Sequence, residues 1–313
     1  MDEYQPSSTL INPHQPNNMI YSAEDTAQIE RLIRISKEKP LLPETFIPWE
    51  EPEQEHHVFL PEQLVSLVGL PIYETLRAPQ KSELARREVT QALYAYCWSE
   101  GLFSVFMTRY IQDKMPDDLE RRFLLCEIIE ESRHQEMFAA TIKKLGRSPL
   151  PVTGFQQWFG GFAVRICPAD FAFISCLTVE MLADRYGEHL RQETGIFPVL
   201  QKISQLHNIE EARHIIFTKA LLKHYTDGAG FLRRSWYSIV VLFNIRFFLG
   251  TYVRTEIYRD IGLKNPEKVF RQAFPHYRSR FAQECLGTVR EFVDSFQGYN
   301  FLTRPLWKWV LKM

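Results

Sequence analysis

The sequence predicts an all-α protein whose core is a four-helix bundle. Apolar residues recur with the helical period of about 3.6 residues in long blocks between residues 82 and 225. Alternation of apolar and polar residues, which is typical of strands, nowhere extends beyond a few positions. Because long helical segments joined by loops are the pattern of a bundle, these two observations together indicate the fold class.

The ends of the helices follow from residues that start or stop helical backbone. Gly146 and Gly195 each follow a helical block, as glycine often does at a helix C-terminus. Pro168 and Pro198 stand where the next blocks begin. The four bundle helices are expected at about 82–112, 117–145, 168–193 and 198–225. A shorter helix is expected at about 155–166, and two or three more between 231 and 296.

The first 60 residues differ from the rest of the chain. They hold seven of the eighteen prolines and one short helical pattern, at about 23–38, which Ser22 can cap. We therefore predict an extended, partly irregular N-terminal arm at 1–60. A single domain is expected at 61–313, with the bundle core at about 82–225.

Charge and cysteine content exclude several classes of partner. Lys and Arg number 37 against 38 Asp and Glu, so no basic field is available for nucleic acid. The first ten residues are acidic and polar, unlike a signal peptide. The five cysteines show no CxxC spacing and lie among apolar neighbours, as reduced core thiols do. We predict a cytoplasmic protein.

The longest apolar run, at 236–253, is predicted to be a buried core helix. Asn244, Arg246 and Gly250 interrupt it, whereas a membrane helix needs about 20 mostly uncharged residues. No transmembrane segment is therefore expected.

Two motifs carry the functional prediction. Glu131 and His134 form one Glu-x-x-His motif, and Glu211 and His214 form a second. Residues three apart on a helix share a face, so each pair can bind a metal ion. Both pairs lie on apolar stripes that face the core of the predicted bundle. Because buried carboxylates are unfavourable without compensation, the pattern predicts two divalent cations at the centre of the bundle.

Further candidate ligands lie at regular distances from these motifs. Glu100 precedes Glu131 by 31 residues, and Glu180 precedes Glu211 by 31 residues. The equal offsets predict approximate two-fold symmetry about a shared site. His207 lies four residues before Glu211 on the same face and is predicted to be another ligand, with a packed core histidine as the alternative. Carboxylates and imidazoles without thiolates favour iron, with manganese as the alternative, over zinc.

This set of motifs resembles the p-aminobenzoate N-oxygenase family of non-haem di-iron oxygenases. The family pattern is a glutamate, Glu-x-x-His, a second glutamate, and His-x-x-x-Glu-x-x-His. The matching metal ligands here are Glu100, Glu131, His134, Glu180, His207, Glu211 and His214. The resemblance covers about residues 80–225. It implies a ferritin-like bundle whose two irons activate O₂ through a peroxo intermediate and oxidise the nitrogen of an arylamine or related amine. The third histidine separates this pattern from ferritins and from most bacterial di-iron monooxygenases.

One departure from the family concerns the substrate. Members that act on p-aminobenzoate are expected to hold its carboxylate with a basic residue near the first glutamate ligand. Residues 88–99 contain no such residue, and Tyr94, Tyr96 and Trp98 lie there instead. An uncharged or larger arylamine, or a different oxidation, therefore stays open.

Residues beside the motifs are candidates for orienting the ligands. Glu130 can pair with Arg213 across two helices, and Asp184 can accept a hydrogen bond from a histidine ligand. The alternative for each is an ordinary surface charge.

The remaining predictions concern partners and competing functions. A small organic substrate is expected, with electrons from an external reductase or ferredoxin, because the chain has no glycine-rich phosphate loop for a bound nucleotide or flavin. A homodimer is one candidate assembly. Two other functions stay open: a di-iron enzyme that oxidises fatty acyl or aldehyde chains, and a ferritin-like ferroxidase or iron-binding protein. A ring-sized cavity favours the N-oxygenase, and a long apolar tunnel favours the fatty substrate.

Overall fold

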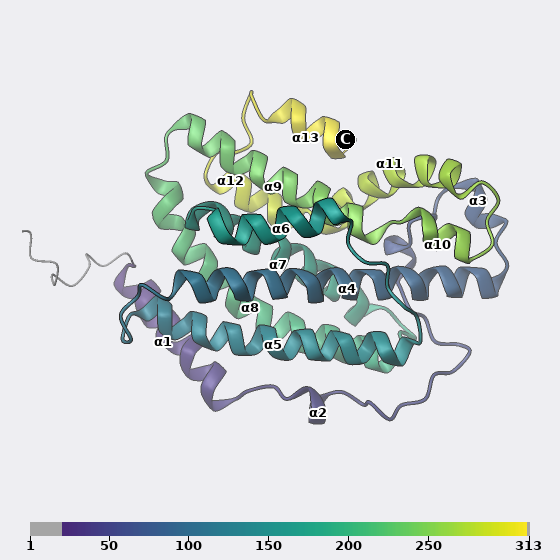
Figure 1. Ribbon diagram of the computed structural model, residues 1–313, viewed down its shortest axis with the longest axis horizontal. Coiled ribbons are helices and arrows are strands. Elements are labelled where there is room, and N and C mark those ends of the chain that lie inside the picture. Colours follow the sequence, from purple (N-terminus) through teal and green to yellow (C-terminus); the bar gives the residue numbers. More distant parts are fainter. Residues whose placement is uncertain (1–20, 312–313) are drawn as a thin grey trace, which may run out of the picture.

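Four long helices form the centre of the fold in the computed structural model, which describes residues 21–311 (Figure 1). α4 packs along α5 and α7 packs along α8, while contacts between α5 and α8 and between α4 and α7 close the bundle. No strand occurs within residues 21–311, so the predicted all-α class is confirmed. The bundle helices are α4 (Ala78–Tyr110), α5 (Leu119–Leu145), α7 (Ala169–Gln192) and α8 (Pro198–Asp227).

The helix ends lie within about four residues of the predicted ones because local capping decides them. Gly146 ends α5 with φ of 63°, a conformation that glycine adopts without strain. Ser22 caps α1 (Ala23–Glu38), and its Oγ accepts a hydrogen bond from the backbone N–H of Asp25 at 3.0 Å. Thr153 and Gln156 form a capping box at the start of α6 (Gly154–Ile166).

Further helices cover one side of the bundle (Figure 1). α9 packs against α4 and α7, and α6 packs against α4. The sequence predicted two or three helices between 231 and 296, whereas the structure has four there. They are α9 (Phe231–Tyr252), α10 (Thr255–Asp260), α11 (Pro266–Cys285) and α12 (Gly287–Ser295). The prediction was too low because a helix of six residues, such as α10, is too short to show a period of 3.6.

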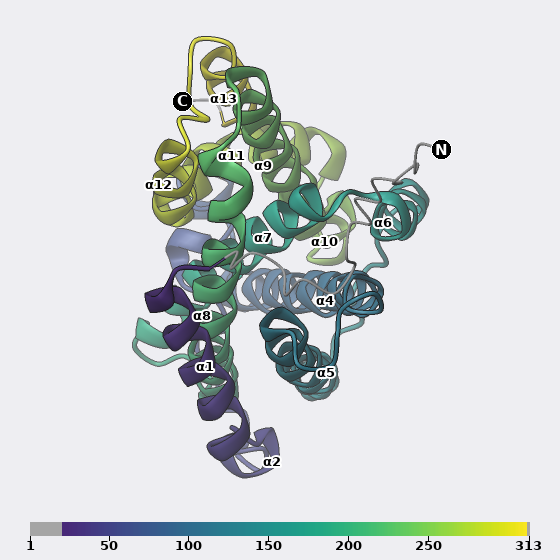
Figure 2. The same ribbon diagram turned by 90° about the vertical axis from the view of Figure 1, so that its left-hand side faces the viewer.

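The N-terminal segment crosses the opposite side. α1 packs against α5 and α8 (Figure 2), and Arg122 of α5 pairs with Glu30 of α1 at 2.6 Å. Residues 1–20 of the predicted arm lie outside the described residues. The other short helices are α2 (Pro43–Phe46), the 3₁₀ helix η1 (Glu62–Leu64), α3 (Pro71–Glu74) and α13 (Arg304–Leu311).

The apolar stretch of α9 lies partly in the core. By length and composition alone, the segment Phe231–Asp260 could cross a membrane, with mean hydropathy of 1.3 in its most apolar window. Of that window, 56% is buried inside the protein, and core helices of water-soluble proteins pass the same test. Tyr237, Ile245 and Leu249 are fully buried against the bundle. The structure therefore agrees with the predicted core helix.

A buried carboxylate of α4 is hydrogen-bonded to a segment outside the bundle. Glu88 accepts hydrogen bonds from the backbone N–H of Ser66 at 2.9 Å and from the Ser66 hydroxyl. The same hydroxyl lies 2.8 Å from the Tyr258 hydroxyl of α10. Burial raises the pKa of Glu88 to about 7, although the hydrogen bonds from Ser66 act in the opposite direction.

This raised pKa predicts a pH-dependent effect of Glu88→Gln. Between the ordinary pKa of 4.5 and about 7, the unfolded chain loses a proton that the folded protein keeps, so stability falls as pH rises through this window. Glutamine does not ionise, and its Oε1 can accept from the Ser66 N–H while its Nε2 donates to the Ser66 hydroxyl oxygen. The variant should therefore gain stability over the wild type between about pH 5 and pH 8, by on the order of 3 kcal/mol at the upper end.

Urea unfolding of both proteins in the presence of a chelator measures this difference. A difference that does not change with pH would show that Glu88 ionises at its ordinary pKa in the folded protein.

Candidate metal centre

Acidic and histidine side chains from all four bundle helices meet at the centre of the bundle. Each of them is at most 5% exposed. α4 contributes one carboxylate and α7 another, while α5 and α8 each contribute three residues on one helical face. The residues are Glu100, Glu127, Glu131, His134, Glu180, His207, Glu211 and His214.

These side chains form two groups, and within each group the candidate ligand atoms lie within 4.8 Å of one another. One group contains Glu100, His134, His207 and Glu211. The other contains Glu127, Glu131, Glu180 and His214. Each group has the size and the oxygen and nitrogen donors needed to hold a metal ion. The fold thus brings together all seven residues singled out from the sequence and adds Glu127.

Two carboxylates lie between the groups. Glu131 Oε1 is 3.3 Å from Nδ1 of His214, and Glu131 Oε2 is 3.9 Å from Nδ1 of His134. Glu211 Oε1 is 3.6 Å from Nδ1 of His134 and 3.5 Å from Nδ1 of His214. Glu131 and Glu211 can therefore contribute oxygen atoms to both groups, as expected from their equivalent positions in the two Glu-x-x-His motifs.

Seven polar atoms at the centre lack hydrogen-bond partners within residues 21–311. A buried polar atom without a partner costs about 1–3 kcal/mol, so a cluster of them is unfavourable in the protein alone. Two divalent cations would satisfy these atoms and offset the negative charge, and the residues therefore fit a dinuclear metal centre. The unpaired atoms are Oε2 of Glu100, Glu127, Glu131, Glu180 and Glu211 and Nδ1 of His134 and His214.

The outer nitrogen of each motif histidine is held by a glutamate from the opposite helix. Nε2 of His134 lies 2.8 Å from Glu210 Oε2, and Nε2 of His214 lies 2.8 Å from Glu130 Oε2. An Nε2–H that donates to a carboxylate leaves the lone pair on Nδ1. Both lone pairs then face the centre, which is the tautomer that metal binding requires.

A buried arginine joins these two glutamates. Arg213 Nη2 donates to Glu130 at 2.7 Å and to Glu210 at 3.2 Å. The predicted pairing of Glu130 with Arg213 is therefore confirmed. The prediction that Asp184 accepts a hydrogen bond from a histidine ligand is wrong. Its side chain accepts one from Asn208 Nδ2 at 2.5 Å instead.

Burial and mutual repulsion dominate the electrostatics of the carboxylates. Burial, and then the charges of Glu131 and Glu211, raise the pKa of Glu100 well above its usual range. Burial also raises the pKa of Glu180, with Glu127 and Glu211 adding to the effect. In the metal-free protein these groups hold protons that a divalent cation would displace, so metal binding should release protons.

The histidines divide into two kinds. Burial lowers the pKa of His134, but the carboxylates of Glu131 and Glu210 outweigh it and raise the pKa to about 9, so in the metal-free protein Nδ1 holds a proton that a metal ion would displace. Burial and the charge of His134 lower the pKa of His207 well below its usual value. His207 is therefore a neutral imidazole, with Nε2 at 3.1 Å from Glu100 Oε1 and 3.2 Å from Glu211 Oε1.

The comparison with known families agrees with this geometry. The family model described as p-aminobenzoate N-oxygenase AurF matches residues 22–297, which is most of the chain. The chain belongs to the p-aminobenzoate N-oxygenase family. This membership supports an oxygenase activity, and the two buried Glu/His groups support a metal-dependent centre.

The individual proteins that this chain resembles have names that state no activity. Proteins of Mycobacterium bovis and Mycobacterium tuberculosis, both named only as uncharacterized, are 25% identical to this chain over 138 residues. The match spans 43% of this chain and 40% of each relative. The chain thus matches less than half the length of these curated relatives.

Sequence reasoning missed Glu127, although a signal for it was present. Glu127 precedes Glu131 by four residues, as His207 precedes Glu211. The two segments are therefore one pattern, with a carboxylate in the first and an imidazole in the second. Burial raises the pKa of Glu127 to about 8, as for the other carboxylates that face the centre.

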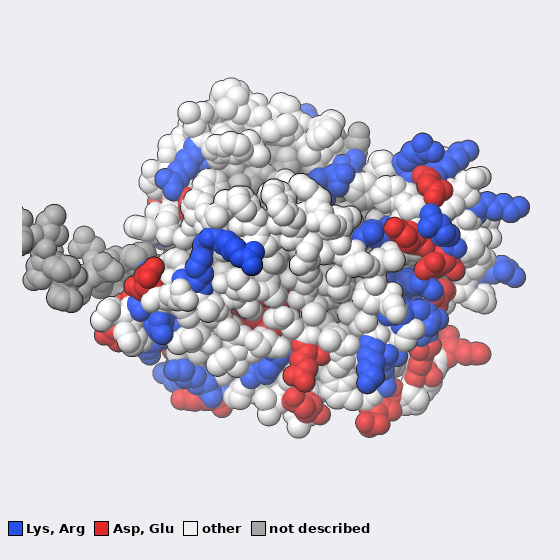
Figure 3. Space-filling view, in the orientation of Figure 1, with Lys and Arg blue, Asp and Glu red and all other residues white. Residues whose placement is uncertain are grey.

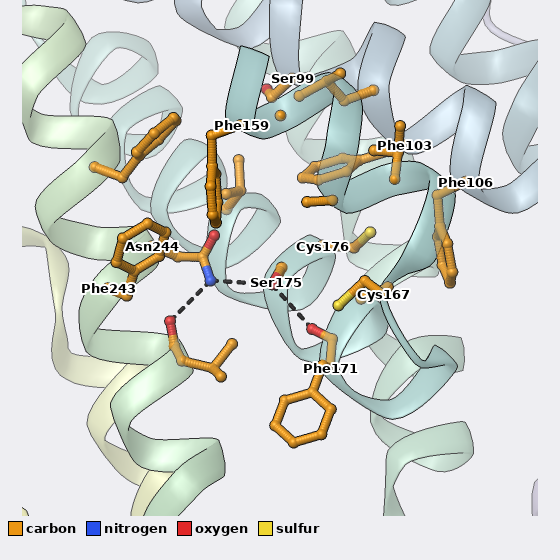
Figure 4. A pocket seen from close by; sticks show the side chains of 18 of the residues that line it. Ser99, Phe103, Phe106, Phe159, Cys167, Phe171, Ser175, Cys176, Phe243 and Asn244 are labelled. Atoms are coloured by element: carbon orange, nitrogen blue, oxygen red, sulfur yellow. Dashed lines mark hydrogen bonds between the residues drawn. The ribbon is translucent and has the colours of Figure 1, made fainter. Parts of the chain in front are cut away.

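A cavity of about 230 Å³ lies beside the metal centre, between α4, α6, α7 and α9 (Figure 4). Ser99, Phe103 and Val179 line both the cavity and the small hollow that contains Glu100 and Glu180. The surface over α6 and α9 carries few charged side chains (Figure 3). The cavity therefore offers an apolar compartment next to the candidate ligands.

Proposed function

We propose that this protein is a non-haem di-iron oxygenase that uses O₂ to oxidise the nitrogen of an organic amine, most directly an arylamine. The observation that carries the proposal is the pair of buried Glu/His groups with inward-facing unpaired atoms, in a chain of the p-aminobenzoate N-oxygenase family. The proposed iron ligands are Glu100, Glu131, His134, Glu180, His207, Glu211 and His214, with Glu127 as an eighth.

Bound iron would supply the activation of O₂ and the redox change. The chain's own residues do the rest. Glu130 and Glu210 hold the imidazoles of His214 and His134 in one tautomer and orientation. The cavity holds the amine beside the centre, and apolar side chains such as Phe103 keep water away from it. The external electron donor, the homodimer and the cytoplasmic location remain predictions from the sequence.

The cavity also bears on the competing functions. An apolar cavity of about 150 Å³ holds a benzene molecule, so 230 Å³ accommodates one substituted ring. The cavity would not enclose the whole of a long fatty chain, and iron storage would not need an apolar compartment at the metals. The size of the cavity therefore supports an aromatic substrate.

The test is a reaction with reduced, iron-loaded protein, O₂ and a panel of arylamines beside long-chain acids and aldehydes. Hydroxylamine, nitroso or nitro products are expected, and metal-free protein is the control. Hydroxylated or shortened chains with unchanged amines would overturn the proposal in favour of the fatty substrate.

The equivalent positions 127 and 207 provide a paired prediction. His207→Ala removes a nitrogen from one group and Glu127→Ala removes an oxygen from the other, so each variant should weaken mainly one of the two metal sites. We expect about a 10- to 100-fold loss of affinity for one ion per chain in each variant. Chelator competition and Mössbauer spectra of ⁵⁷Fe-loaded protein measure this loss. Two unchanged iron signals in His207→Ala would return His207 to the role of a packed core histidine.

A further inference from the structure

The wall of the cavity beside the metal centre contains no charged side chain. Its polar members are two serines, one asparagine, two thiols and one indole: Ser99, Ser175, Asn244, Cys167, Cys176 and Trp98. Arg109 reaches this region only to donate to the backbone carbonyl of Cys167 at 2.8 Å, and it does not line the cavity. A negatively charged substrate group would therefore find no cation here.

The hydrogen-bond donors on one side of the cavity already have acceptors within the protein (Figure 4). Asn244 Nδ2 donates to Ser175 Oγ at 3.0 Å and to the carbonyl of Val240 at 2.8 Å. The Ser175 hydroxyl donates to the carbonyl of Phe171 at 2.9 Å. These two side chains thus have no N–H or O–H left for a ligand.

The other two strong side-chain donors are also used. The Ser99 hydroxyl donates to the carbonyl of Tyr96 at 2.8 Å, and Trp98 Nε1 donates to Gln157 Oε1 at 3.1 Å. Only the weak thiol donors of Cys167 and Cys176 remain. The cavity wall therefore presents acceptors to a ligand and almost no donors.

One of these acceptors is in a position to bind a ligand. Because Asn244 Nδ2 donates to Val240 and Ser175, the orientation of the amide is fixed and Oδ1 points away from both (Figure 4). Asn244 Oδ1 makes no hydrogen bond to any other part of the described chain. Ser175, its neighbour, precedes Glu180 by five residues on α7, which is about 7.5 Å along the helix axis. Val179 lines both this cavity and the hollow that contains Glu180, so the cavity extends along α7 from Ser175 toward the candidate ligands.

We propose that the substrate is a neutral amine with a hydrogen-bond donor at the end opposite the reacting nitrogen, and that Asn244 Oδ1 accepts that hydrogen bond. This inference rests on the proposed function. A carboxylate has only acceptors and carries a charge, so burial here without a partner would be unfavourable. A hydroxyl, an amide N–H or a second N–H has the complementary chemistry. The cavity thus selects against aminobenzoate itself.

Binding to the iron-loaded protein tests the proposal without turnover. The probes are 4-aminobenzamide, which is neutral with a donor, methyl 4-aminobenzoate, which is neutral without one, and 4-aminobenzoate, which is an anion. Titration calorimetry should show the amide binding at least about tenfold more tightly than the anion, a difference of about 1.4 kcal/mol. The ester should lie between them. Equal or tighter binding of the anion would overturn the proposal, whatever the variants show.

A matched pair of variants tests the role of Asn244. Asn244→Leu removes the acceptor and should abolish the preference for the amide over the ester. Asn244→Lys adds a cation and should reverse the preference between the amide and the anion. Unfolding temperature and metal content of each variant show whether the bundle is intact. An unchanged preference in an intact Asn244→Leu protein would remove Asn244 from the proposal. If neutral amines bind but are not oxidised, the proposed function fails and the binding preference stands.

Discussion

Replacing Glu131 or Glu211 by alanine is expected to abolish binding of most of the metal. Each carboxylate lies between the two histidines that belong to different groups, so one substitution removes an oxygen donor from both groups. Wild-type protein loaded with ferrous iron should hold about two ions per chain. Either variant should hold well below one.

The loss of metal should appear in stability as well. A ligand that binds only the folded state stabilises it in proportion to the logarithm of its concentration over its dissociation constant. Addition of ferrous iron should therefore raise the unfolding temperature of the wild type and leave that of both variants nearly unchanged. Elemental analysis and thermal unfolding, with and without iron, measure the two effects.

Glu136→Ala is a matched control for this experiment. Glu136 lies on α5, as Glu131 does, but its side chain is exposed. This variant should bind metal as the wild type does. A single zinc ion per chain that neither Glu131→Ala nor Glu211→Ala removes would contradict the di-iron assignment.

The fold could be predicted largely from the sequence because its signals are local. A helix with buried and exposed faces shows the period of 3.6 wherever it is long, and Ser22, Gly146 and Pro198 mark ends that depend only on neighbouring backbone. The covering helices were predicted less well. Short helices such as α10 depend on contacts with distant segments, and single-sequence periodicity does not contain them.

The site shows the same division between local and distant information. The spacing of Glu211 and His214 places both on one helical face, which the sequence states directly. Which groups lie behind the ligands depends on how the helices are rotated about each other. Asp184 lies one turn after Glu180, but α7 turns it toward Asn208 of α8. Glu130 reaches His214 because α5 and α8 face each other at equivalent positions.

The spacing of residues in the sequence could not predict the cavity beside the candidate ligands. Its wall is formed by side chains from four helices, two of which, α6 and α9, lie outside the bundle. The sequence did show that residues 88–99 lack a basic side chain. The structure shows that the whole cavity wall lacks a charged side chain, and not only residues 88–99. The cavity as a whole is therefore unsuited to a carboxylate substrate.

Glu130→Ala should destabilise the protein more than most single substitutions, even without metal. Glu130 is 2% exposed and accepts hydrogen bonds from His214 Nε2 at 2.8 Å and Arg213 Nη2 at 2.7 Å. Its loss leaves a buried arginine with Glu210 as its remaining acidic partner at 3.2 Å. Removal of one partner from a buried ion pair costs about 3–5 kcal/mol. Urea unfolding in the presence of a chelator measures this loss.

The companion variant Glu130→Gln distinguishes two roles of Glu130: its charge offsets Arg213, and its oxygen orients the His214 imidazole. Glutamine keeps an acceptor for the Nε2–H of His214, so the imidazole stays in the tautomer that presents Nδ1 to the centre. It removes the charge that offsets Arg213. Glu130→Gln should therefore lose part of the stability but retain more metal affinity than Glu130→Ala, in which affinity should fall about 10- to 100-fold. Equal metal affinity in wild type and Glu130→Ala would mean that the bundle alone orients His214, and that the carboxylate behind it serves only to compensate the buried arginine.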